Sequence, residues 1–191
     1  MHVGRGLVTM RRGASILLAL ALLPWGSPAT FADWQADPDD RLQQRAAQTI
    51  QNFRDKVERS HPYFDDAYAY AIWPGITRIG FGFGGAYGKG IVIEQGQAVG
   101  TVGYWQFSSG IQAGAKNFSM ILFFRNKEAL ESLKRGDMQF MGQAGIDIGT
   151  FGAHGTPTYS EGVAVIPLTR FGLMGEFAAT GVKFNFKPVS P

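Results

Sequence analysis

The sequence predicts an α+β fold that is mainly β: a small curled antiparallel sheet or barrel of about eight to ten strands with two or three packed helices. The chain has 191 residues, of which 45% are hydrophobic and 17% charged, enough apolar material for a single folded domain. Its 26 glycines follow no Gly-X-Y period and disfavour a helical bundle, because each interior glycine costs a helix about 1 kcal/mol. From Thr77 onward, apolar residues recur at every second position, as in strands.

The amino terminus has the pattern of a secretory signal peptide over residues 1–32. Arg11-Arg12 precede an apolar run, Ala14–Leu23, and small residues follow. The run is too short for the ~20 residues that a spanning helix needs. We expect cleavage after Ala32, with Ala29 as the alternative, and Met10 is an alternative start. The mature domain, residues 33–191, is then expected in the periplasm or outside the cell, and possible attachment at the outer-membrane periphery is left open.

Charge argues against a nucleic-acid partner. The leader contains three arginines and no acid, so the mature chain keeps 15 basic and 15 acidic residues. A neutral chain lacks the basic surface that a nucleic-acid backbone requires. The sequence contains no cysteine, which excludes disulfides, thiolate nucleophiles and iron-sulfur clusters.

An acidic amphipathic helix is predicted over about 38–59. Asp37 is the expected N-cap and Pro38 the first helical residue. The polar face mixes charge signs, which favours packing on a sheet over lying on an anionic membrane. The apolar stripe consists of Leu42, Ala46, Ile50, Phe53 and Val57.

Two shorter helices are predicted, at Phe64–Ile72 and at Lys127–Arg135. The second has Asn126 as N-cap and Gly136 as its stop.

The predicted barrel covers about 77–186. In its first strand the apolar residues alternate with glycine, and a strand with a bare glycine face can curl sharply or let another element approach. Gln95-Gly96 is typical of a hairpin turn. The expected strands are 77–83, 88–94, 98–108, 110–115, 118–124, 138–151, 162–169 and 173–186, the last of which is open to division.

No catalytic, cofactor or metal motif is convincing. Gly80–Gly85 matches G-x-G-x-x-G, but a strand follows it, so no helix N-terminus is present to bind a phosphate. His61 and His154 are the histidines that remain after processing, and neither has a partner at ligand spacing. No G-x-S-x-G elbow is present. We therefore expect a protein that is not an enzyme, with no cofactor and no metal.

Aromatic residues are dense between positions 81 and 124 and are interleaved with cations. These residue types suit acyl chains and phosphate head groups. They would also serve simply to fill the core of a small barrel, and both interpretations stay open. The residues selected as candidate lipid contacts are Trp73, Tyr87, Tyr104 and Trp105, with Arg78, Lys89 and Lys116 as cations for phosphate.

The segment Ala71–Gly90, AIWPGITRIGFGFGGAYGKG, resembles the SYLF, or Ysc84-related, lipid-binding family. The likeness continues through Ser109–Ala115, Met120–Phe124 and Asn126–Leu130, and covers roughly residues 46–186. The resemblance implies binding of phospholipids or phosphoinositides, for some eukaryotic members also of actin, and a role at the cell envelope for secreted bacterial members. Gln97–Gly100 replaces the Trp-Ser-x-Pro stretch of many members, so a head-group preference is not implied.

The tail Gly162–Leu168 is also similar to a periplasmic envelope-integrity barrel family of alphaproteobacteria. Taken together, the sequence predicts a non-enzymatic phospholipid-binding protein of the bacterial envelope whose partner is phospholipid or a membrane surface. The alternatives are a small integral outer-membrane β-barrel, an envelope-integrity structural protein without a ligand, and a protein-interaction scaffold. The lipid and the oligomeric state are left open.

Overall fold

The computed structural model describes residues 34–141 and 159–189. The expected signal peptide and most of the expected strand 138–151 lie outside these residues. The described elements are, in chain order, α1 (Arg41–Lys56), the 3₁₀ turn Glu58–Ser60, α2 (His61–Asp66), β1 (Ala69–Glu94), β2 (Gln97–Phe124), α3 (Lys127–Arg135), β3 (Gln139–Met141) and β4 (Val163–Pro188).

The strands form one antiparallel sheet in the order β1-β2-β4-β3. β2 pairs along its length with β1 on one side and with β4 on the other. Within the described residues the sheet is not closed, since β1 and β3 are its edges. The predicted class, α+β and mainly β with a curled antiparallel sheet, is confirmed.

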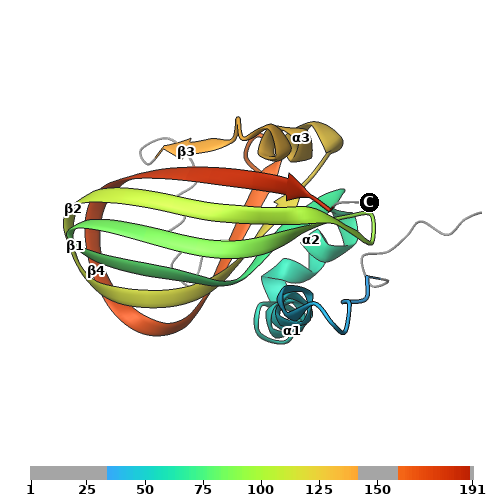
Figure 1. The fold of residues 1–191 in the computed structure, drawn as a ribbon, viewed down its shortest axis with the longest axis horizontal. Helices are drawn as coiled ribbons and strands as arrows, with labels where there is room; N and C mark the ends of the chain where they lie inside the picture. The colour runs from blue at the N-terminus through green and yellow to red at the C-terminus, as the bar shows by residue number, and fades with distance from the viewer. Residues whose placement is uncertain (1–33, 142–158, 190–191) are drawn as a thin grey trace, which may run out of the picture.

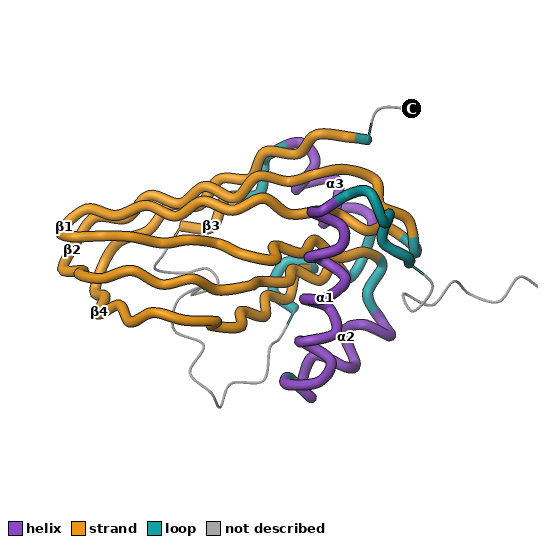
Figure 2. Tube along the Cα trace, turned by 60° about the horizontal axis from the view of Figure 1, so that its bottom comes forward, coloured by secondary structure: helices purple, strands orange, loops and turns teal. Residues whose placement is uncertain are grey.

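Three strands are much longer than expected and fold back on themselves (Figures 1 and 2). β1, β2 and β4 contain 26, 28 and 26 residues, and each would extend about 85 Å if it were straight. Each instead bends near its middle, so segments expected as separate strands, such as 77–83 and 88–94, are two halves of one. The bend uses backbone angles that favour glycine, with φ of 70° at Gly82 and 133° at Gly114.

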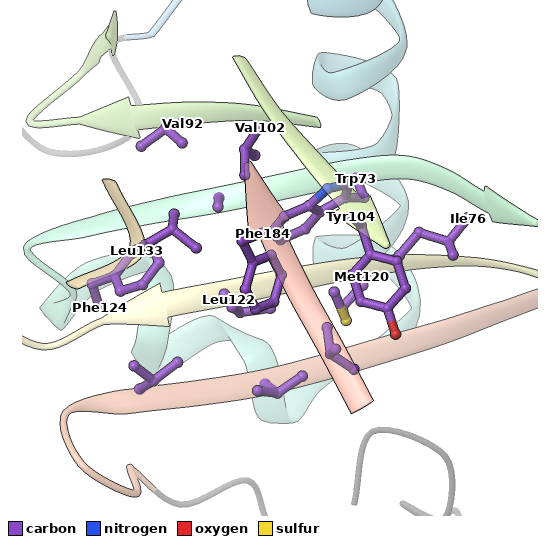
Figure 3. Close-up of a cluster of buried hydrophobic side chains, with 14 of the residues drawn as sticks. Trp73, Ile76, Val92, Val102, Tyr104, Met120, Leu122, Phe124, Leu133 and Phe184 are labelled. Atoms are coloured by element: carbon purple, nitrogen blue, oxygen red, sulfur yellow. The ribbon is translucent and has the colours of Figure 1, made fainter. Parts of the chain in front are cut away.

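The two halves of the folded sheet enclose the main core. Trp73 of β1 packs on Tyr104 of β2 and on Phe184 of β4, with ring centroids 6.2 and 5.5 Å away (Figure 3). Ile76 and Met120 are fully buried beside them. We call the surface lining this core the inner face and its reverse the outer face.

Close approach of the halves of β1 depends on glycine. A β-carbon at Gly90 would lie 2.5 Å from the carbonyl oxygen of Ile72, and one at Gly88 would lie 2.7 Å from Cγ1 of Ile76. Both distances are too short for real atoms, so neither position accepts a larger residue without movement of the backbone.

Helices α1 and α2 cover part of the outer face with a second core. Phe53 of α1 and Phe64 of α2 are buried against β1 and β2, where the Phe64 ring lies edge-on to Phe123 at 4.9 Å. The apolar stripe predicted for the first helix is thus directed at the sheet.

Two details of the predicted helices are wrong. The N-cap of α1 is Asp40, whose carboxylate accepts from two backbone N–H groups, while Asp37 accepts from the N–H of Asp39 in the preceding turn. The second helix ends at Asp66, and Ala69–Ile72 begins β1. These β1 residues are buried on both faces, which gives an apolar run without a strand period.

The predicted helix Lys127–Arg135 is confirmed as α3, with Asn126 as N-cap and Gly136 at φ 77° after its end. Leu130 and Leu133 are fully buried and cover the end of the core farthest from the bend (Figure 1). Among the described residues, the helices are all too short or too polar to cross a bilayer.

Replacing Gly90 by alanine is expected to lower the free energy of unfolding by about 3 kcal/mol, because the new methyl group would overlap the carbonyl of Ile72. The matched control is Gly181→Ala in β4, where nothing lies within 4 Å of the new atom and a change within about 0.5 kcal/mol is expected. Urea unfolding of both variants checks this. Equal stabilities would contradict the close crossing of the two halves of β1.

Candidate functional site

Large apolar side chains are exposed where β1 and β2 bend. Ile79, Phe81, Phe83 and Phe107 are 61%, 88%, 78% and 75% exposed. These four residues, called the apolar tip, lie at the end of the molecule opposite the helices (Figures 1 and 2). An exposed apolar cluster of this kind is typical of an interaction surface.

The bend itself explains why these residues face solvent. Along β1 the bulky residues alternate with Gly80, Gly82 and Gly84, and alternate strand residues lie on opposite faces. The bulky residues lie on the convex side of the bend, where they are exposed. The apolar face of this strand therefore points outward.

An aromatic pair follows the tip along the outer face. Tyr87 and Trp105 are direct cross-strand partners, with ring centroids 4.6 Å apart. They are 44% and 46% exposed, so each ring has one side on the protein and one in solvent. Such amphipathic rings concentrate at membrane-water interfaces.

Lysines follow the aromatic pair on the same face. Lys183 of β4 lies opposite Trp105, and Lys89 lies opposite Gly103, two residues farther from the tip. Lys187 lies opposite Thr101. These three exposed lysines form the lysine row. The described positions of this outer face around them carry no carboxylate.

The structure divides the predicted contact residues into two groups. Tyr87, Lys89 and Trp105 lie together on the outer face. Trp73 and Tyr104 are fully buried in the core, and the Tyr104 hydroxyl donates to Oε1 of Gln106 at 2.7 Å. In this structure the latter two therefore cannot touch a ligand outside the protein.

The predicted cations Arg78 and Lys116 lie on the inner side of the sheet, paired with each other in the register of β1 and β2. Arg78 is 2% exposed, and the Lys116 ammonium lies 5.6 Å from the ring centroid of Phe118. They are separated from the outer aromatic pair by the sheet itself.

Sequence reasoning selected Lys89 but did not select the tip phenylalanines or the other two lysines of the row, Lys183 and Lys187, as contacts. Phe81, Phe83 and Phe107 belonged to the aromatic set, but alternation alone does not tell which face is outside. Lys183 and Lys187 are far from Trp105 in sequence, and only the pairing of β2 with β4 places them beside it.

A titratable cluster lies at the end opposite the tip. Glu94 accepts from the Tyr68 hydroxyl at 2.6 Å and from Nζ of Lys134 at 2.9 Å, and Lys134 also contacts Glu131. Burial alone would raise the pKa of Glu94, but these hydrogen bonds and the charges of Lys134 and Lys127 outweigh it, so that the pKa is below its usual value. The cluster fastens α3 to β1.

Within the described ranges, no three His, Cys, Asp or Glu side chains gather as a metal site would require. A scan against protein-family models found no match to the chain, and searches of curated proteins and of solved structures found none either. The SYLF resemblance therefore stays a prediction from the sequence.

Removing the Glu94 charge should destabilise the protein in a pH-dependent way. Because the pKa of Glu94 is lowered in the folded state, its contribution is present above the unfolded value near 4.5 and is lost as pH falls through the folded value. Glu94→Gln should therefore cost about 1 kcal/mol at pH 7 and progressively less below pH ~4.5. The exposed Glu128→Gln in α3 is the control. Denaturant unfolding from pH 3 to 7 checks this, and a pH-independent difference would contradict it.

Proposed function

We propose that this chain is a non-enzymatic protein of the bacterial cell envelope that binds the surface of phospholipid membranes with its apolar tip. One observation carries the proposal: from the bend outward, the outer face presents exposed phenylalanines, then a Tyr-Trp pair with Lys183 beside it, then Lys89 and Lys187. A bilayer presents the complementary order of acyl chains, interface and phosphates.

The lengths fit one leaflet. Lys89 follows Phe83 by six residues, about 20 Å along a strand. One leaflet with its head groups is also about 20 Å thick. Lys89 therefore stays at the level of the phosphates or farther from the centre of the bilayer, at any angle of insertion of the tip.

The energetics favour reversible attachment. Transferring one phenylalanine side chain from water into an apolar environment contributes about 1.5–3 kcal/mol, and each lysine near an anionic surface about 1 kcal/mol. Three phenylalanines and the lysine row therefore support peripheral binding, opposed by the cost of association.

The described sheet favours this mode over an integral outer-membrane barrel. A membrane barrel needs a closed sheet with a continuous apolar band outside. Within the described residues β1 and β3 are edge strands that do not pair with each other, so the sheet is open. Helices α1 and α2 also cover part of the outer face. The leader and the SYLF resemblance support the envelope location.

Removing the tip should abolish most membrane binding. In sedimentation with vesicles of equal phosphatidylglycerol and phosphatidylcholine, the chain from residue 33 should bind, and Phe81→Ser with Phe107→Ser should bind at least tenfold more weakly. The control is Val189→Ser, which removes an exposed apolar residue at the far end of β4.

Unchanged binding by the double variant would refute the role of the tip. Failure of the native chain to bind vesicles, with sedimentation velocity showing a dimer that the double variant disrupts, would assign the tip to self-association. Native protein that resists carbonate extraction from cell membranes would favour the integral barrel.

A further inference from the structure

Three nitrogen-bearing side chains from three elements converge on Gly75, in the bulged region of β1. A β-carbon at Gly75 would lie 3.2 Å from Nη2 of Arg45, 3.7 Å from Nδ2 of Asn117 and 3.8 Å from Nη1 of Arg170. Arg45 comes from α1, Asn117 from β2 and Arg170 from β4. We call this group of donors around a position without a side chain the Gly75 cradle.

The cradle is held in place by its own contacts. Nη1 of Arg170 donates to the carbonyl oxygen of Pro74 at 2.9 Å, and the buried Ser119 hydroxyl donates to the same oxygen. Nδ2 of Asn117 donates to Oγ1 of Thr77 at 3.1 Å, and its second hydrogen remains for another acceptor. The Pro74 carbonyl and the contact between Asn117 and Thr77 therefore fix two of the three donors.

The charge of the cradle is uncompensated within the described chain. The two guanidinium nitrogens lie within about 7 Å of each other, close enough for like charges to repel. No carboxylate of the described residues lies within 4.0 Å of either guanidinium. An anion at Gly75 would relieve the repulsion and accept hydrogen bonds from several sides.

We propose that the Gly75 cradle binds the phosphate group of a phosphate ester. A phosphate offers tetrahedral acceptors, which suit donors arriving from three directions, and guanidinium forks match it in geometry and charge. Because Gly75 has no side chain, no β-carbon stands between its backbone and the three donors.

The position of the cradle points to a lipid head group as the source of the ester, a step that rests on the proposed function. Gly75 precedes Phe81 by six residues, and Lys89 follows Phe83 by the same number. The cradle and Lys89 thus stand about 20 Å along the strand from the tip phenylalanines, on the two halves of the folded β1. An inserted tip would bring phosphates to both.

The first experiment tests the cradle without a membrane. Titration of the native chain with sn-glycerol 3-phosphate, followed by backbone amide NMR, should shift the resonances of Gly75 and Asn117. Arg45→Gln with Arg170→Gln should weaken this binding at least tenfold. Gly75→Ala should do so too, since its methyl group would lie 3.2 Å from Nη2 of Arg45 and displace that donor while every charge is kept. The control, Lys56→Gln with Lys127→Gln, removes two exposed charges elsewhere and should bind normally.

The second experiment uses vesicles with and without phosphatidylglycerol. The native chain should bind phosphatidylglycerol vesicles several-fold more tightly than phosphatidylcholine vesicles, and Gly75→Ala should lose part of this preference while retaining tip-dependent binding. Native chain that binds glycerol phosphate through the cradle but binds no vesicles would keep the cradle as a site for a soluble phosphate ester and refute the membrane function. Absence of glycerol phosphate binding, or equal binding by both cradle variants and native chain, would overturn the cradle.

Discussion

The structure depends on the sharp bend that folds three long strands onto themselves. Two halves of one strand can cross closely only where side chains are missing, and Gly88 and Gly90 meet Ile72–Ile76 within distances that no β-carbon tolerates. The bend places Trp73, Tyr104 and Phe184, which come from three strands, into one core (Figure 3). Because a curled sheet encloses much of its own core, few further layers are needed to bury the apolar residues. Helices α1, α2 and α3 provide these layers at the end away from the bend.

The same bend creates the candidate site. Residues on the convex side of a sharp turn have no layer above them, so Phe81 and Phe83 are exposed. Their exposure is a property of the sheet's geometry and not of a mobile loop. Because the tip belongs to hydrogen-bonded strands, its backbone is already ordered before binding, which favours its use as a contact surface.

Much of the fold could be predicted from the sequence, and the physical reasons for the errors are specific. The stripe of α1 and the caps of α3 are local signals, and both helices were found. The predicted division into separate strands was wrong for β1, β2 and β4, because glycine is equally typical of a bend within a strand and of a break between strands. For the site, the density of aromatic residues and cations selected Tyr87 and Lys89 but did not show which face of the sheet is inside. Trp73 and Tyr104 were therefore chosen together with Trp105, and Lys183 could be found only through the register of β2 with β4.

The central claim, that the bend meets the bilayer before any other part, can be tested with a depth-sensitive label. The chain has no cysteine, so a single cysteine at Ser109, exposed beside Phe83, can be labelled with an environment-sensitive fluorophore, and Asp65 on α2 serves as the control position. Added anionic vesicles with acyl-chain quenchers should shift the emission of the label at 109 to the blue and quench it, and should leave the label at 65 unchanged. Quenching at 65 but not at 109, or at neither, would contradict the account.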